Sequence, residues 1–229
     1  MTPIDERQPM TMNSNAPQRT STESLISDLG AQLQPVRPLA SPVLRALGWL
    51  AFVALAAGLF IARHHALPRF IARNANPATA LECAAMLLTG IVAVVAAFHA
   101  SIPGRSAAWR WAPVPPLLLW LAGSGLGCLH NGLGLGASGA RFGESPGCFM
   151  FIVVTSLPLA LVLGWLLRRA RPLEPLPVAL LGALGVAALA GFVLQFFHPF
   201  DTTVIDLLFH AAAVCTMLVI ASGVRRVLA

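Results

Sequence analysis

Six apolar segments, each close to the length that crosses a bilayer, constrain the fold of this chain more than any other feature. They lie at about 46–62, 79–101, 112–130, 147–167, 176–197 and 202–223. A helix needs about 20 apolar residues to span the hydrocarbon core, where only helices and closed barrels satisfy every backbone hydrogen bond. Short connections make neighbouring helices antiparallel. The sequence therefore predicts an all-α fold, a six-helix transmembrane bundle over residues 45–224.

The composition agrees with a membrane protein and disfavours several other classes. Hydrophobic residues make up 57% of the 229 residues and charged residues 10%, whereas about a quarter of a soluble domain is charged. The basic residues are all arginine and are scattered among the loops, which does not suit direct binding of nucleic acid. The chain has no HExxH sequence, and no intramembrane acids pair at helical spacing. We therefore do not expect an enzyme.

The distribution of arginine predicts the orientation of the bundle. Eleven of the 15 arginines lie on the side that holds both termini, and four lie on the opposite side. In membrane proteins the cytoplasmic loops carry the excess of Lys and Arg. Both termini are therefore expected in the cytoplasm, and the loops 63–78 and 131–146 on the outer face.

The first 44 residues differ from the rest of the chain. Residues 1–20 are polar and contain prolines, which predicts a disordered cytoplasmic tail. Within 21–44, Thr20 and Glu23 have capping-box spacing at the start of a short amphipathic helix, which should end near Gln34 before a proline-containing linker. The apolar stripe of this helix consists of Leu25, Ile26, Leu29 and Leu33. Because so short a helix is marginal in water, it should lie on the membrane or in a partner's groove.

Three residues at the predicted outer face carry soft or borderline metal ligands: Cys128, His130 and Cys148. Such ligands suit zinc, cadmium or copper(I). Residues two apart point to opposite sides of a regular helix, so Cys128 and His130 could share an ion only where the helix unwinds. A disulfide between Cys128 and Cys148, a pair of thiols awaiting an oxidant, and a purely structural role are the alternatives.

Asp206 and His210 form an intramembrane polar pair, because residues four apart share a helix face. A carboxylate at that depth costs about 2.5 kcal/mol or more, so it should face the bundle interior. The pair could join two helices, or it could line a polar path with Glu82 in a small transporter or channel. A membrane enzyme or haem-binding subunit would need histidines paired across helices, as His130 and His198 could be.

Three stretches resemble one known family, the negative regulators of sigma F. They are LISDLGAQLQPVRPL, SPGCFMFIVVTSLPLALVLGWLLRRARPL and LQFFHPFDTTVIDLLFHAAAV, and the resemblance covers about residues 24–224. It implies an anti-sigma factor of the bacterial inner membrane that holds an extracytoplasmic-function (ECF) sigma factor and releases it under heavy-metal or oxidising stress. It also implies two signal-sensing periplasmic cysteines. One corresponds to Cys148, whereas Pro199 follows His198 where the second is expected.

The resulting hypothesis has an output in the cytoplasm and a sensor outside. The apolar stripe of the amphipathic helix would bind the sigma factor. Chemistry at Cys148, aided by Cys128, His130 and His198, would weaken that hold, with Cys128 standing in for the missing thiol. No cofactor is required. A heavy-metal ion bound transiently by Cys148, Cys128 and His130 could be the signal, and besides the sigma factor the other expected partner is membrane lipid.

Overall fold

The computed structural model describes residues 22–33, 39–135, 145–197 and 204–228. Within these ranges, side chains are described except those of 127–135, 145, 204–206 and 224–228. The chain divides into a unit of residues 1–38 and a unit of residues 39–229. All regular structure in the described ranges is helical, with no strand, which confirms the all-α prediction.

The first unit contains one described helix, α1 (Thr22–Ala31). None of its residues is buried, and it ends before Gln34, so Leu33 lies after the helix and not on it. Gly30 in the last turn weakens helix propagation, which accounts for the earlier end. Thr20, the expected capping residue, lies outside the described residues.

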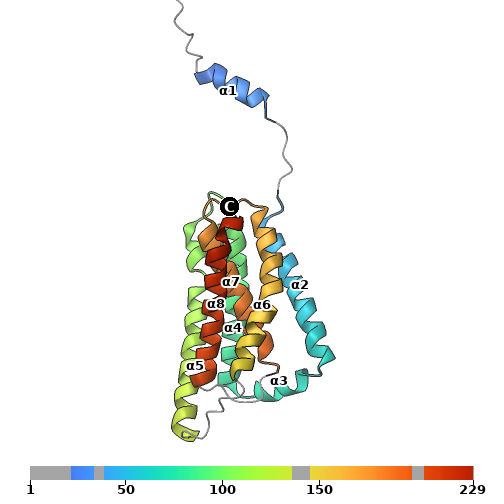
Figure 1. Cartoon of the computed structure of the whole chain (residues 1–229), viewed down its shortest axis with the longest axis vertical. Coiled ribbons are helices and arrows are strands. Elements are labelled where there is room, and N and C mark those ends of the chain that lie inside the picture. Colours follow the sequence, from blue (N-terminus) through green and yellow to red (C-terminus); the bar gives the residue numbers. More distant parts are fainter. Residues whose placement is uncertain (1–21, 34–38, 136–144, 198–203, 229) are drawn as a thin grey trace, which may run out of the picture. The chain divides into compact units, whose positions relative to one another are not determined.

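Six long helices form the second unit, and they run side by side as one bundle (Figure 1). They are α2 (Pro42–Arg63), α4 (Pro77–Ala100), α5 (Val114–Leu135), α6 (Ser145–Arg168), α7 (Pro175–Leu194) and α8 (Val204–Leu228). Each overlaps one of the six predicted segments. Among the described residues, α2, α4, α6 and α7 are long and apolar enough to cross a membrane, which makes this a membrane protein. A six-span count stays a prediction.

Helices α2 and α4 begin at local signals, a few residues before their apolar stretches. The hydroxyl of Ser41 accepts a hydrogen bond from the N–H of Leu44 (3.3 Å), and the side-chain oxygen of Asn76 accepts from the N–H of Ala78 (3.0 Å). A proline follows each capping residue, and its fixed φ suits the first helical turn. These caps place the starts of α2 and α4 earlier than hydropathy alone predicted.

Helix α7 lies in the interior of the bundle, and its packing on α4 depends on two glycines. A Cβ on Gly185 would lie 2.7 Å from Val94 Cγ2 and 3.1 Å from the carbonyl oxygen of Gly90. A Cβ on Gly90 would lie 2.7 Å from Leu189 Cγ. The two backbones therefore approach closely, which is the packing that small residues permit between membrane helices.

Helix α2 lies at the edge of the bundle (Figure 1). Its buried residues, Pro42, Ala46, Trp49 and Val53, all lie among its first twelve residues. In the second half, large side chains such as Leu55 and Leu59 are exposed, as expected for residues that face lipid. Helix α2 is thus buried near its start and exposed toward its end.

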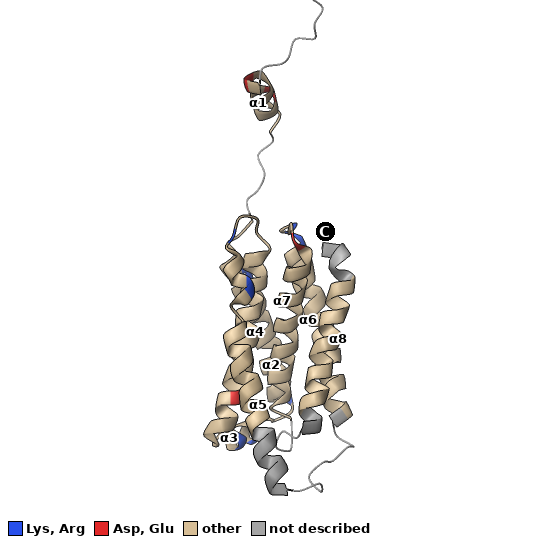
Figure 2. Ribbon diagram, turned by 90° about the vertical axis from the view of Figure 1, so that its left-hand side faces the viewer, with Lys and Arg blue, Asp and Glu red and all other residues tan. Residues whose placement is uncertain are grey.

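In the second unit, the described charged side chains lie near the two ends of the bundle, and none lies in its middle (Figure 2). At the Cys148 end, α2 and α7 end and α4 and α6 begin. At the Arg45 end, the same four helices have their other termini. Two short helices lie in the connections: α3 (Leu67–Arg73) between α2 and α4, and the 3₁₀ helix η1 (Ala107–Trp111) between α4 and α5. The loop expected at 63–78 is therefore wrong in part, because it contains α3.

Candidate functional site

Cys148 lies in the first turn of α6, and its side chain points into the bundle. It is 6% exposed and belongs to a buried group from three helices, here called the Cys148 cluster. The cluster consists of Cys148, Ile152, Ala183, Ala187, Ala190, Leu194, Ala213 and Met217. The other members of this cluster are small or apolar, so an atom added to this sulfur has to displace packed side chains.

A group of aromatic rings connects the Cys148 turn to α2. The Phe197 ring cluster consists of Phe60, His64, Phe151 and Phe197. Phe151 follows Cys148 by three residues, so it lies on the next turn of α6. The ring of Phe60 lies 5.1 Å from that of Phe197 and 6.2 Å from that of Phe151, between centroids. These contacts reach the part of α2 beyond Val53, which has no buried residue.

The short helix α3 contacts the end of α7. Nη1 of Arg73 donates a hydrogen bond to Oε1 of Gln195 (3.1 Å), and the ring of Phe70 stacks on that of Phe196 with centroids 3.9 Å apart. Both Gln195 and Phe196 are buried. The end of α7 is therefore held between α3 and the Phe197 ring cluster. Sequence reasoning missed this contact, although Phe196 and Phe197 at the end of an apolar segment signal an aromatic site.

The three residues of the predicted polar path, Glu82, Asp206 and His210, do not form one group in the described structure. Oε1 of Glu82 on α4 accepts a hydrogen bond from the hydroxyl of Ser124 on α5. His210 on α8 is 5% exposed and lies one turn before Ala213 of the Cys148 cluster. The side chain of Asp206 lies outside the description. Glu82 therefore joins α4 to α5, and His210 lies beside the Cys148 cluster.

The predicted metal ligands are described only in part. Cys128 and His130 lie on α5, which continues as a helix to Leu135 and does not end near 130 as predicted. That backbone does not supply the unwound turn that a shared ion between these two residues needs. Their side chains, and His198, lie outside the description. Where side chains are described, no three His, Cys, Asp or Glu residues gather closely enough to hold a metal ion.

Residues 143–147 read Gly-Glu-Ser-Pro-Gly, which has the spacing of the nucleophile elbow GxSxG of serine hydrolases. That elbow requires a strand immediately before the serine and a helix after it. Ser145 begins α6, and the residues directly before it lie outside the described part of the chain. The match in letters therefore carries no catalytic conclusion.

At the Arg45 end, one arginine anchors α2. The guanidinium of Arg45 donates a hydrogen bond to the carbonyl oxygen of Leu166 on α6 and lies 5.0 Å from the ring centroid of Phe98 on α4. Trp49, one turn later, is 2% exposed. The start of α2, which directly follows the segment from the first unit, is thus bound to two other helices.

The residues predicted to bind a sigma factor are exposed. The exposed fraction is 50% for Leu25, 64% for Ile26, 56% for Leu29 and 80% for Leu33. The first three lie on α1 with the spacing of one helix face. Among the described residues of its unit, nothing covers this face.

Comparison with known proteins gives one match. The model of the family NrsF, described as negative regulator of sigma F, matches residues 29–229. This range includes the end of α1 and the whole bundle. No curated protein and no solved structure matches the chain.

Proposed function

The chain belongs to the negative regulator of sigma F family, and from this premise we propose that it holds an ECF sigma factor at the inner membrane and releases it when a heavy metal or oxidant reacts near Cys148. The family supplies the anti-sigma function. The observation that carries the rest is the separation of an exposed apolar helix face in one unit from a buried thiol in the other.

The output is the apolar face of α1. An amphipathic helix with exposed leucines suits a groove on a folded partner. Leu25, Ile26 and Leu29 would enter that groove, and Leu33 would contact its rim. The occupied surface would be one that the sigma factor needs for RNA polymerase, so binding represses transcription without any catalytic step.

The input is the Cys148 end, which we assign to the periplasm because the opposite side carries the excess of arginine. A metal ion or an oxygen atom added to the sulfur enlarges a side chain that is already enclosed. Cys128 would supply a second thiol in place of the residue at Pro199, with His130 and His198 nearby as further ligands. Cys128→Ser leaving the stress response intact would remove it from this mechanism.

The route between input and output runs through α2. Displacement of the first turn of α6 would move Phe151 against Phe60 and so shift the loosely packed half of α2. Helix α2 leads, through residues 39–41, toward the segment that binds the sigma factor. A signal that changes occupancy from almost complete to almost none must favour the released state by about 5.5 kcal/mol, a value within reach of metal–thiolate bonds.

Co-purification with the ECF sigma factors of the same cell tests the output. The intact chain should retain one of them, and a chain lacking residues 1–40 should retain none. Leu29→Asp puts a charge on the apolar face and should also abolish capture. Ser27→Asp puts the same charge on the opposite face of α1 and should leave capture intact. If the intact chain captures no sigma factor, the proposal fails, and a channel lined by Glu82 and His210 becomes the hypothesis to test.

The same capture tests the input when the cells are treated with cadmium or peroxide. Cys148→Ser should keep the sigma factor bound after treatment, whereas the wild-type chain should release it. Cys83→Ser and Cys215→Ser are matched controls, since Cys83 is equally buried and Cys215 is exposed. Release from Cys148→Ser equal to that of the wild type would refute sensing at Cys148.

A further inference from the structure

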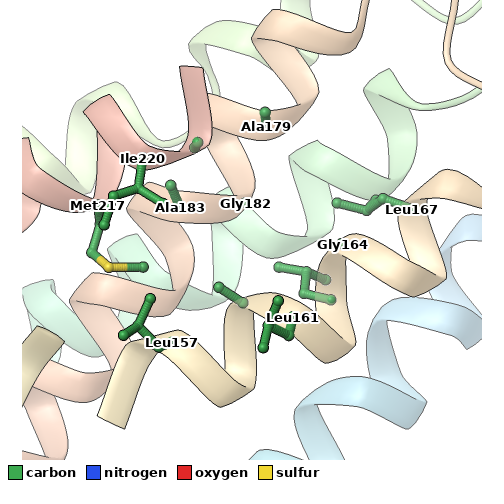
Figure 3. Close-up of a pocket in the computed structure, with 12 residues that line it drawn as sticks. Leu157, Leu161, Gly164, Leu167, Ala179, Gly182, Ala183, Met217 and Ile220 are labelled. Atoms are coloured by element: carbon green, nitrogen blue, oxygen red, sulfur yellow. The ribbon is translucent and has the colours of Figure 1, made fainter. Parts of the chain in front are cut away.

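An apolar cavity lies between α6, α7 and α8 at the half of the bundle nearer the Arg45 end. Its volume is about 260 Å³. Figure 3 shows side chains of α6 such as Leu157 and Leu161 on one side and Met217 and Ile220 of α8 on the other, with Gly182 and Ala183 of α7 between them. Every residue lining the cavity is Leu, Ile, Met, Ala or Gly. Such a lining does not hold water, so an occupant would be apolar.

The rim of the cavity is open toward the surroundings of the bundle. Leu161 is 73% exposed, Leu157 40% and Ile220 37%, although all three line the cavity. In a membrane, the surroundings at this depth are lipid chains. The acyl chain of a lipid can therefore enter the cavity from the side, and the helices do not need to move apart.

Positive charge lies at one end of the same cavity. Leu167 lines the cavity, and the next two residues, Arg168 and Arg169, are exposed at the end of α6. The guanidinium of Arg169 lies 3.8 Å from the ring centroid of Trp165, which is itself 55% exposed. A tryptophan at this position is typical of the membrane interface, where the phosphates of lipids lie. The arginines thus stand at phosphate depth beside an apolar cavity.

From these observations we propose that the cavity between α6, α7 and α8 binds one acyl chain of an anionic phospholipid, whose headgroup phosphate contacts Arg168 and Arg169. The charge complementarity selects an anionic lipid over a zwitterionic one. The small residues of α7 make room for the chain: a Cβ on Gly182 would already lie 3.4 Å from Leu163 and 3.5 Å from Leu167. This lipid site is independent of whether the chain binds a sigma factor.

Native mass spectrometry of the full-length protein tests the site. The probes are palmitoyl-oleoyl phosphatidylglycerol and the phosphatidylcholine that has the same two acyl chains. The protein should retain phosphatidylglycerol preferentially. Gly182→Leu fills the cavity and should weaken retention about tenfold or more, since excluding two methylenes of a chain already has that effect. Replacing Arg168 or Arg169 by Gln should weaken retention of phosphatidylglycerol about fivefold each. Retention of phosphatidylcholine, whose choline already balances the phosphate charge, should weaken less.

Matched controls separate the site from general lipid contact. Gly58→Leu adds the same side chain to α2, where a Cβ meets nothing within 4 Å, and Arg105→Gln removes an arginine from the same end of the bundle. Both should retain phosphatidylglycerol as the wild type does. If Gly182→Leu fails to fold, Ile220→Phe adds bulk from the rim instead.

Two results would overturn the proposal. If Gly182→Leu retains phosphatidylglycerol as well as Gly58→Leu does, the lipid binds the protein surface unspecifically and not in this cavity. A concentration-dependent dimer that Gly182→Leu dissociates would assign the cavity to a second copy of the chain.

Discussion

Helices α2 and α7 both consist mainly of apolar residues, yet they have opposite positions in the bundle. Four of the 22 residues of α2 are buried, against fourteen of the 20 residues of α7. The difference lies in side-chain size. Helix α7 has glycine or alanine at its contacts, among them Gly185, whereas α2 carries exposed Leu and Phe such as Phe52. Where lipid and protein are equally apolar, small residues decide which helix is central.

This contrast separates a fixed helix from a movable one. Helix α7 packs against α4 with backbones in contact, so a shift of either one breaks many contacts at once. Helix α2 is held by Arg45 and Trp49 at one end and by aromatic rings at the other. If the bundle transmits a signal, the part of α2 beyond Val53 is the segment that can move without disturbing the core.

The largest expected effect comes from Gly185→Leu. Its Cβ would lie within 3.1 Å of Val94 and of the carbonyl oxygen of Gly90, and the backbone there cannot retreat. We expect a loss of about 3 kcal/mol or more in the free energy of unfolding. Unfolding by denaturant in mixed micelles measures it.

Gly58→Leu on α2 is the matched control, because a Cβ there meets nothing within 4 Å. It should change the free energy of unfolding little. Equal losses from the two substitutions would contradict the distinction between a fixed and a movable helix.

A smaller effect is expected from Arg45→Gln. The substitution removes the charged donor to the Leu166 carbonyl and the contact with the Phe98 ring. Because a hydrogen bond to a charged group contributes more than a neutral one, the loss should be about 2 kcal/mol. Hydrogen exchange should become faster in the first half of α2 and stay unchanged in α7. Arg63→Gln, at the far end of the same helix, controls for the lost charge; faster exchange throughout the bundle would contradict a local anchor.

Much of the fold could be predicted because the signals are local. Runs of apolar residues place all six long helices, and Ser41-Pro42 and Asn76-Pro77 mark the starts of two of them. Helix α3 was missed because seven residues, LPRFIAR, are too few for a periodic pattern. It is stabilised instead by distant contacts, such as that of Phe70 with Phe196.

The candidate site could be predicted only in its members, and not in its surroundings. The rotation of a helix that is apolar all round leaves no trace in hydropathy, so the burial of Cys148 against α7 and α8 could not be derived. The contact of Phe60 with Phe197 could not be derived either, because the two residues are far apart in the sequence. The exposed face of α1 was predictable, because its pattern is local.

A further step down in size is expected from Phe60→Ala. This substitution removes ring contacts with Phe197 and His64, at 5.1 and 4.7 Å between centroids. Since an aromatic pair contributes about 1 kcal/mol beyond its buried area, a double-mutant cycle of Phe60→Ala with Phe197→Ala should give a coupling of that size. Hydrogen exchange should become faster in the second half of α2 only. Phe52→Ala, whose ring is exposed on the same helix, should show no coupling with Phe197→Ala; coupling of both phenylalanines alike would argue against a defined ring cluster.

The smallest effect tests the fixed helix at its start. Nη2 of Arg110 lies 2.7 Å from Oε1 of Glu174, directly before α7, but the two side chains are 38% and 57% exposed. Because water and salt screen such a pair, a double-mutant cycle of Arg110→Gln with Glu174→Gln should give about 0.5 kcal/mol, and less at high salt. Helix α7 should keep its position, since its buried contacts with α4 are far more extensive than one ion pair. A coupling several times larger, unaffected by salt, would mean that the start of α7 depends on η1, and that the core helix is less independent of the surface than its packing implies.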